Sequence, residues 1–315
     1  MFDPFKDFAT AGYLRNTLGE KDPQSIKTLE HLAFDQNLAE ALEYLATRKV
    51  IGYDNFLMVH KILFSEFYPW AGQDRTVTAP NISVSKGDVL FCHPADARRA
   101  LTEGLRLAQS KGKMVESPGL IMGFFAYGHP FLDGNGRTML LTHMELAHRA
   151  GFSIAWASTK KDAYLAALSS EIEAPGKGIL DAYLKPFVGP KLERNTWSKS
   201  VLSVKGLGGF RDEYQVGGEL TDALVMEKYR LFEQKRDYAY MAHGIAETGD
   251  TMPAQAWLAQ WATTTGKTAG VVGKEDGNVP YSVVHLASDG VVLDRGMRCT
   301  VNSGHLRFKQ PARFS

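Results

Sequence analysis

The sequence has little of what builds a disulfide framework, a zinc site or a membrane span. Its 315 residues include two cysteines, Cys92 and Cys299, whose wide separation matches neither a disulfide framework nor a metal-binding pattern. No stretch approaches about 18 uninterrupted apolar residues, the length expected of a transmembrane helix. The formal net charge is only +1, which points to neither nucleic acid nor a membrane surface as a partner. These absences favour an ordinary globular protein in a reducing compartment.

The beginning of the chain also lacks the features of a signal peptide. Its first twenty residues, MFDPFKDFATAGYLRNTLGE, carry acidic residues early and no long apolar run. We therefore expect a cytoplasmic protein, although an effector secreted into another cell would have the same composition. The length is typical of about two domains.

Residues 1–190 are predicted to form a mainly helical domain. Apolar residues recur at helical spacings in residues 22–47 and 53–67, and further helices are expected at residues 94–110, 118–127, 162–172 and 178–184. Residues 75–91, RTVTAPNISVSKGDVLF, interrupt this pattern, because they are rich in Thr and Val and contain Pro and Gly breakers. Such a segment predicts a β-hairpin or an extended flap inside the helical domain.

Residues 191–315 are predicted to form a smaller α+β domain. The glycine-rich residues 204–218 are expected to be a loop, and helices are expected within residues 220–262. From about residue 268 to 310, alternating apolar residues separated by Ser-Asp-Gly and Asn-Ser-Gly turns predict three or four short antiparallel strands. No residue pattern in this part indicates a particular chemistry.

The segment HPFLDGNGRTML, residues 129–140, suits phosphate chemistry. Glycines before a helix let an anion approach the free N–H groups of its first turn, so Gly134-Asn135-Gly136 ahead of a helix starting near Arg137 predicts an anion-binding nest. Arg137 adds a cation with forked donors, and Asp133 adds a hard oxygen ligand suited to Mg²⁺. His129 is the residue here that can take a proton near pH 7. An ordinary surface turn with a core histidine is the alternative interpretation.

These residues resemble the motif of the Fic family, His-Pro-Phe-x-x-Gly-Asn-Gly-Arg-x-x-Arg, from His129 to Arg137. Upstream, FYPWAGQDRTVTAPNISVSKGDVLF resembles the Trp-Ala-Gly-x-x-Arg-Thr-Val segment that leads into the family's active-site flap. The resemblance spans roughly residues 10–188 and leaves the rest of the chain unassigned. It implies a helical Fic core that most often transfers AMP from ATP to a Ser, Thr or Tyr hydroxyl of a target protein, releasing pyrophosphate.

The resemblance also implies a role for each matched residue. His129 would be the general base, and Asp133 would hold Mg²⁺ on the ATP phosphates. Gly134, Asn135 and Gly136 would form the anion hole, and Arg137 would bind the phosphate chain. The flap residues Val84, Ser85, Lys86 and Gly87 would hold an unknown target protein in an extended form, as strand addition does. Neither a membrane nor a nucleic acid is expected as a partner.

The sequence departs from the family motif at its end, where the second arginine is replaced by Leu140. In the family, this arginine pairs with an inhibitory glutamate from a Ser/Thr-x-x-x-Glu-Gly/Asn helix, in the same chain or in a separate antitoxin. No such helix is visible in this sequence. Three alternatives therefore stay open: an enzyme that escapes this control, an enzyme that uses another donor, and a weakened nucleotide-binding or regulatory protein with the same fold.

Overall fold

In the computed structural model, the described residues are 15–87, 89–204, 215–229, 231–232 and 236, together with five short strands between residues 269 and 308. The chain divides into two compact units. The first comprises Met1–Ile172 and Gly178–Tyr229, and the second comprises Glu173–Lys177 and Arg230–Ser315. The division into domains at residue 190 stays a prediction.

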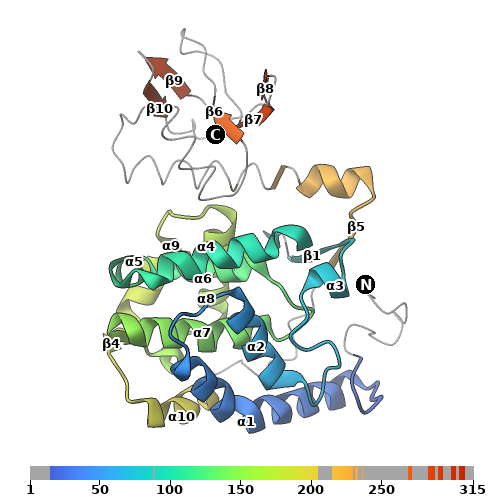
Figure 1. Ribbon diagram of the computed structural model, residues 1–315, viewed down its shortest axis with the longest axis vertical. Coiled ribbons are helices and arrows are strands. Elements are labelled where there is room, and N and C mark those ends of the chain that lie inside the picture. Colours follow the sequence, from blue (N-terminus) through green and yellow to red (C-terminus); the bar gives the residue numbers. More distant parts are fainter. Residues whose placement is uncertain are drawn as a thin grey trace. The chain divides into compact units, whose positions relative to one another are not determined.

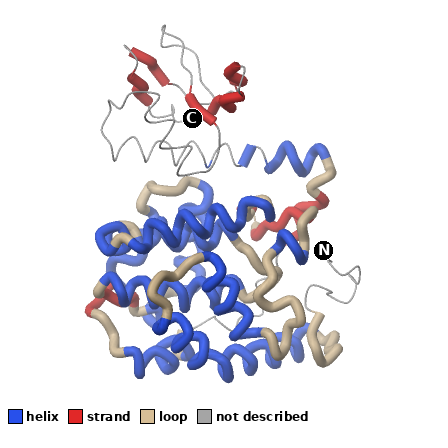
Figure 2. The backbone as a smooth tube through the Cα atoms, viewed as in Figure 1, coloured by secondary structure: helices blue, strands red, loops and turns tan. Residues whose placement is uncertain are grey.

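The first unit is mainly helical, as predicted (Figures 1 and 2). Its α-helices are α1 (Pro23–Thr47), α2 (Tyr53–Phe64), α3 (Arg75–Thr78), α4 (Ala97–Gln109), α5 (Lys111–Glu116), α6 (Pro118–Gly128), α7 (Asn135–Ala150), α8 (Lys161–Glu173), α9 (Ile179–Leu184) and α10 (Trp197–Leu202). Short 3-10 helices cover Pro94–Asp96, Trp156–Ser158, Lys185–Phe187 and Arg194–Thr196, and β3 (Phe152–Ile154) pairs antiparallel with β4 (Val188–Pro190).

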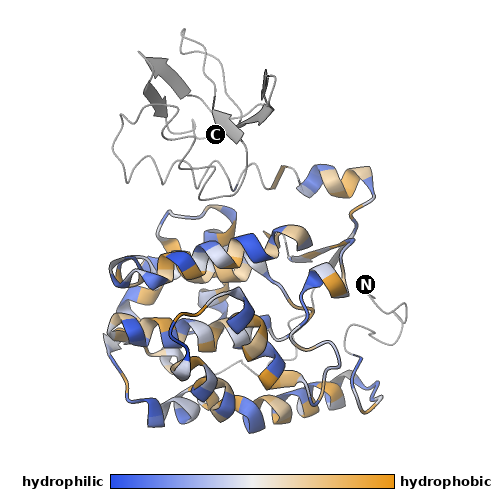
Figure 3. Cartoon of the chain, viewed as in Figure 1, coloured by the Kyte–Doolittle hydropathy of each residue, from blue (hydrophilic) through white to orange (hydrophobic). Residues whose placement is uncertain are grey.

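Helix α6 forms the centre of this unit, because every one of its residues is buried. It packs against α4, α7 and α9, while most of the surrounding helices carry mixed polar and apolar faces (Figure 3). Pro118 opens α6 at a position where the missing N–H costs nothing. Gly128 closes it against α4, where an added Cβ would lie 2.1 Å from Leu101 Cδ1. The end of α6 is thereby fixed directly before the motif that begins at His129.

The predicted flap is a hairpin of β1 (Ile82–Lys86) and β2 (Val89–Leu90), but it starts later than expected. Residues 75–78 form the short helix α3 rather than extended chain. The Asp74 side chain accepts a hydrogen bond from the Thr76 N–H at 3.0 Å, and this cap favours a helical turn over the β preference of Thr and Val.

The glycine-rich loop expected over residues 204–218 is also partly wrong. Residues 215–219 form strand β5 (Gln215–Glu219), which pairs antiparallel with the edge of β1 opposite β2. Val84 lies opposite Val216 in this register, and Leu220 N donates to Asn81 O at 2.8 Å. Strand β1 of the flap is therefore the middle strand of a three-stranded sheet in the order β2-β1-β5.

The second unit contains antiparallel strands, as predicted, although the described residues hold five rather than three or four. Strands β6 (Ala269–Val271), β7 (Val283–Ala287) and β8 (Gly290–Leu293) form one sheet, and β9 (Cys299–Asn302) pairs with β10 (His305–Phe308). Residues 223–229 are helical, but most of the region 220–262, in which helices are predicted, lies outside the described residues. Within the described part of the chain, no helix is long and apolar enough to cross a membrane.

Candidate functional site

His129 follows α6 in a left-handed conformation, with φ of 38°. No other non-glycine among the described residues has a positive φ, which is a strained conformation for a residue with a Cβ. The fully buried Arg75 holds this backbone: its Nε donates to His129 O and its Nη2 donates to Cys92 O, both at 2.7 Å. One guanidinium thus joins the start of the motif to the end of the flap hairpin.

The imidazole of His129 is buried and lies flat against the ring of Phe91, with centroids 3.7 Å apart. Burial lowers the pKa of His129 well below its ordinary value, and the positive charges of Arg75 and Lys86 act in the same direction. The Nδ2 group of Asn135, an amide that only donates, lies 3.2 Å from His129 Nε2. His129 is therefore neutral near pH 7, with Nε2 as the nitrogen that accepts a proton.

Asn135 fixes the loop between α6 and α7. Its Oδ1 accepts from Phe131 N at 2.9 Å and its Nδ2 donates to Phe131 O at 2.8 Å. The ring of Phe131 is fully buried and stacks on His60 with centroids 3.7 Å apart. His60 Nε2 in turn lies 3.0 Å from Asp133 O. Side chains of α2 and α7 thus hold the loop in one conformation.

The start of α7 has the form of an anion-binding nest. The helix begins at Asn135, two residues earlier than predicted, with Gly134 before it at φ 76°. A Cβ on Gly134 would lie 2.6 Å from Phe64 Cε2, so both the conformation and the space require glycine. A Cβ on Gly136 would meet no protein atom within 4 Å, which leaves that side of the first turn open to a ligand. No side chain caps the helix at Gly134.

Two charged residues of α1 enter the site, and sequence reasoning missed both. Lys27 Nζ lies 2.6 Å from Asp133 Oδ2 and 3.1 Å from Glu30 Oε2. Glu30, fully buried, also pairs with Arg137, whose Nη2 lies 3.8 Å from Asp133 Oδ1. Their i, i+3 spacing puts Lys27 and Glu30 on one face of a helix, but nothing local shows that this face meets residues more than a hundred positions away.

The pKa values of Asp133 and Arg137 follow from their burial and from the charges that surround them. Burial alone would raise the pKa of Asp133, but Lys27 and Arg137 outweigh burial and lower it to about 2. Burial opposes the charge of Arg137, yet Glu30 and Asp133 overcome this and raise its pKa. Asp133 and Arg137 are therefore both charged near pH 7.

Asp133 fits a shared cation site rather than a protein-only metal centre. Among the residues that the structure describes, no group of three or more His, Cys, Asp or Glu side chains could hold a metal ion. A single carboxylate suits Mg²⁺ when phosphate oxygens supply further ligands. Its Oδ1 accepts from Gly134 N at 2.6 Å and its Oδ2 pairs with Lys27, so a cation at Oδ2 would replace the ammonium group of Lys27.

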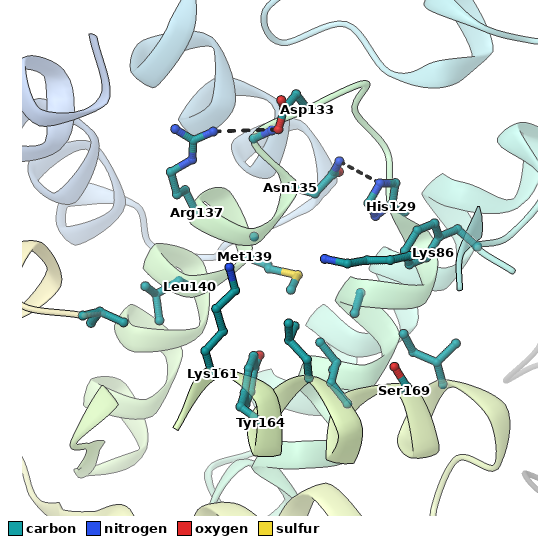
Figure 4. A pocket seen from close by; sticks show the side chains of 18 of the residues that line it. Lys86, His129, Asp133, Asn135, Arg137, Met139, Leu140, Lys161, Tyr164 and Ser169 are labelled. Carbon is teal, nitrogen blue, oxygen red and sulfur yellow. Dashed lines mark hydrogen bonds and ion pairs between the residues drawn. The ribbon is translucent and has the colours of Figure 1, made fainter. Parts of the chain in front are cut away.

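The motif residues His129, Asp133, Asn135 and Arg137 all line one cavity of about 250 Å³ (Figure 4). Its polar side contains the side chains of Lys27, Lys86, His129, Asp133, Asn135 and Arg137. Its apolar side contains Met139, Leu140, Trp156, Tyr164, Leu165 and Leu168, and Lys161 of α8 also lines it. Among the described residues of this lining, Asp133 is the one acidic residue. A nest, a neutral base, several cations and an apolar wall together suit an anionic ligand with an apolar part.

The predicted flap residues do not all reach this cavity. Lys86 lines it, with its side chain directed inward (Figure 4), whereas Val84 and Ser85 are buried within the three-stranded sheet. Gly87 forms the hairpin turn at φ 58°. The residues that follow β1 also contribute, since Val89 and Phe91 line the cavity. The hydroxyl of Tyr229 donates to Phe91 O, which ties the segment after β5 to the residue that stacks on His129.

Comparisons with known proteins agree with the motif. Residues 51–147 match the model of the Fic/DOC family. The chain is 27% identical over 185 residues to the probable protein adenylyltransferase y4lH of Sinorhizobium fredii, a match covering 56% of this chain and 84% of that protein. It is 29% identical over 162 residues to the protein adenylyltransferase VbhT of Bartonella schoenbuchensis, covering 49% of this chain and 32% of that protein.

A solved structure shows a weaker likeness. The BepC protein of Bartonella tribocorum with bound AMPPNP is similar at a TM-score of 0.46 and 15% sequence identity, covering 56% of this chain and 93% of that one.

Proposed function

The chain belongs to the Fic/DOC family, and on that premise we propose that it is a protein nucleotidylyltransferase that moves AMP from ATP to a hydroxyl of a target protein. The observation that carries the proposal is the placement of the buried, neutral His129 beside Asn135 and the open first turn of α7 in one cavity. The printed names of two relatives, the probable protein adenylyltransferase y4lH and the protein adenylyltransferase VbhT, support the same reaction.

His129 would act as the general base. The target hydroxyl gives its proton to the imidazole while its oxygen bonds to the α-phosphorus of ATP. The bond from the α-phosphorus to the bridging oxygen breaks, and pyrophosphate leaves. His129 is neutral near pH 7 and Arg75 holds its backbone, so the base is in the protonation state that the reaction requires. The target hydroxyl would take the place of the Asn135 amide, which donates to Nε2.

The start of α7 would stabilise the charge that develops on the phosphate. The N–H groups of its first turn point out of the helix and carry partial positive charge. Asn135 would position this turn and the base together, because its amide contacts Phe131 and His129 at once. Asp133 would hold Mg²⁺ jointly with the phosphates, and the metal would supply further charge neutralisation there.

The apolar side of the cavity would receive the nucleoside. Trp156 and Tyr164 pack edge to face, with ring centroids 5.7 Å apart, and Leu165 and Leu168 continue this wall. Aromatic and aliphatic side chains of this kind suit a base and a ribose ring, while the cations lie toward the nest.

A target protein would bind along the flap to reach the site of the reaction. Strand β5 restricts the edges of the flap sheet to which a target segment can add. The edge of β1 that strand addition requires is already paired with β5 of the same chain. A target segment therefore replaces β5, or it uses the two-residue strand β2 at the opposite edge.

A second candidate function is nucleotide binding without transfer. It is favoured by Leu140, which leaves an apolar side chain in the cavity at the motif's second arginine position, and by the internal pairing of Arg137 with Glu30. Such a protein would bind ATP, and its biological effect would survive replacement of His129.

Intact-protein mass spectrometry separates the two. In the first experiment, the purified protein is incubated with Mg²⁺ and each of ATP, GTP, CTP and UTP, and its mass is measured. In the second, the protein is incubated with Mg²⁺, cell extract and each nucleotide labelled at the α-phosphate, and labelled proteins are sought. We expect a gain of one adenylate or a labelled target with the wild type and neither with His129→Ala. Binding of a non-hydrolysable ATP analogue without any label favours the second candidate. Absence of both binding and label contradicts the two proposals.

A further inference from the structure

We propose that Lys27 of α1 holds the cation position at Asp133 before the nucleotide binds and leaves it when the metal ion arrives. Binding of Mg²⁺ at this site is then an exchange of one cation for another. The proposal deepens the proposed function and rests on it, because it concerns how the same cavity takes up the metal and the phosphates. Lys27 lies outside the motif, 106 positions before Asp133 in the chain.

The two carboxylate oxygens of Asp133 have different partners. Oδ1 accepts a hydrogen bond from Gly134 N at 2.6 Å and lies 3.8 Å from Arg137 Nη2, so it belongs to the loop that leads into α7. Oδ2 lies 2.6 Å from Lys27 Nζ. A metal ion on Oδ2 would lie within a few ångströms of this ammonium group, and the repulsion between the two cations favours the departure of one. Lys27 is therefore the group that a metal ion at Asp133 has to displace.

The surroundings of Lys27 allow its ammonium group to leave Asp133. The side chain is 21% exposed and lines the cavity, and its long aliphatic stem is flexible. Glu30, one turn further along α1, places a second carboxylate oxygen 3.1 Å from Lys27 Nζ. An ammonium group that leaves Asp133 thus keeps Glu30 as a counterion, and the exchange creates no unpaired charge on α1.

Lys27 should also decide how strongly nucleotide binding depends on the metal. Asp133 and Arg137 lie at the polar side of the cavity (Figure 4), where the phosphates would bind. Without any cation on Oδ2, the Asp133 carboxylate would repel these phosphates. Lys27 removes this repulsion when the metal is absent, and it competes with the metal when the metal is present. Both effects make nucleotide binding less dependent on Mg²⁺ than Asp133 alone would make it.

The test measures the affinity for a non-hydrolysable ATP analogue at pH 8 by isothermal titration calorimetry, once with saturating Mg²⁺ and once with EDTA. We expect Lys27→Met to weaken metal-free binding by about tenfold and to leave binding with Mg²⁺ within about twofold of the wild type. The metal dependence, defined as the ratio of the metal-free to the metal-loaded dissociation constant, should therefore rise several-fold. By linkage, the metal-free complex of Lys27→Met should then bind added Mg²⁺ more tightly by the same factor.

Two further variants serve as controls. Lys21→Met removes an exposed lysine six positions earlier and should keep both wild-type affinities. Asp133→Asn removes the charge for which Lys27 and the metal compete. In that background, Lys27→Met should no longer raise the metal dependence. Thermal melting checks that each variant is folded.

Each contrary result has its own meaning. An equal loss of affinity with and without Mg²⁺ in a folded Lys27→Met overturns the proposal, because it would make Lys27 a direct phosphate ligand. Unchanged metal-free binding overturns it as well. A rise in metal dependence that persists in the Asp133→Asn background overturns the exchange at Asp133. A wild-type protein that binds the analogue under neither condition contradicts the proposed function itself, so the two failures are distinguishable.

Discussion

Arg75 and His129 are joined by a side-chain-to-backbone contact across 54 residues of sequence. Arg75 Nε donates to His129 O at 2.7 Å, and the Arg75 N–H donates to Pro130 O at the same distance. The contact holds His129 in its left-handed conformation and is itself fully buried. The short helix α3 therefore acts on the candidate base through the backbone rather than through the imidazole.

Replacing Arg75 should impair the reaction more than nucleotide binding. Arg75→Met removes two charge-assisted hydrogen bonds and leaves His129 O and Cys92 O without these donors. We expect the transfer rate to fall by about a hundredfold or more, because small displacements of a base are costly, while affinity for an ATP analogue changes by less than about threefold. Unfolding free energy should fall by about 3 kcal/mol.

Arg98→Met is the matched control, since Arg98 lies on α4 with 64% of its side chain exposed and pairs with the exposed Asp54. Urea unfolding and single-turnover transfer measure the two effects. A transfer rate for Arg75→Met close to that of the wild type would contradict the positioning role of Arg75.

The candidate base should stay active at unusually low pH. Burial is the main cause of the lowered pKa of His129, with help from Arg75 and Lys86, so protonation requires a pH well below 6.5. Since only the neutral imidazole can take a proton, the transfer rate should be flat from pH 8 to 6.5 and fall only at a pH well below 6.5.

Removing one of the positive charges near His129 should shift the acid limb of the transfer rate, that is, the pH range in which the rate falls. Lys86→Met takes away a positive charge near His129, so its acid limb should shift upward by roughly half a pH unit. The exposed control Arg98→Met should leave the limb in place. A wild-type acid limb at or above pH 6.5 would show that His129 is not the base or is not buried during the reaction.

The part of the site formed by the motif itself could be predicted from the sequence, because the residues that indicate it are neighbours in the chain. A glycine pair at a helix start predicts an open first turn, and the residue types around it predict the phosphate chemistry. The helix start was misplaced by two residues, since Asn135 bonds back to Phe131 and already belongs to α7. The site residues from other elements had no such signal, apart from Arg75 and Lys86 in the segment that resembles the flap and the approach to it.

Residues brought by tertiary packing could not be predicted. Lys27 and Glu30 lie on α1, whose periodicity predicts a helix but not its partner. Strand β5 contains glycine and reads as a loop, yet pairing with β1 more than 100 residues earlier makes it a strand. In both cases the deciding interaction joins distant parts of the chain, which composition and spacing do not report.

The pair of Glu30 and Arg137 should be strongly coupled in stability. Glu30 is fully buried and the Arg137 side chain is 7% exposed, so removing one partner leaves a buried charge without its main counterion. Glu30→Gln and Arg137→Gln should each lower the unfolding free energy by about 2–4 kcal/mol. The double variant should lose clearly less than the sum, with a coupling above about 1.5 kcal/mol in urea unfolding.

The exposed pair Lys113 and Glu116, 3.2 Å apart on α5, provides the matched control cycle. Its coupling should be below about 1 kcal/mol, because water already solvates both groups. If the losses at Glu30 and Arg137 are simply additive, the pair does not hold the site together.

Strand β5 covers the flap edge, and this contact should protect the backbone of β1. Val216 lies opposite Val84, and a proline at residue 216 removes an N–H and restricts the strand. In Val216→Pro, amide exchange of the peptide covering residues 82–90 should accelerate about tenfold or more in hydrogen–deuterium mass spectrometry, with α4 unchanged. Val216→Thr, which keeps the β preference, should exchange like the wild type. Unchanged exchange in Val216→Pro would mean that β5 does not protect this edge, which would then be open to a target segment without displacement.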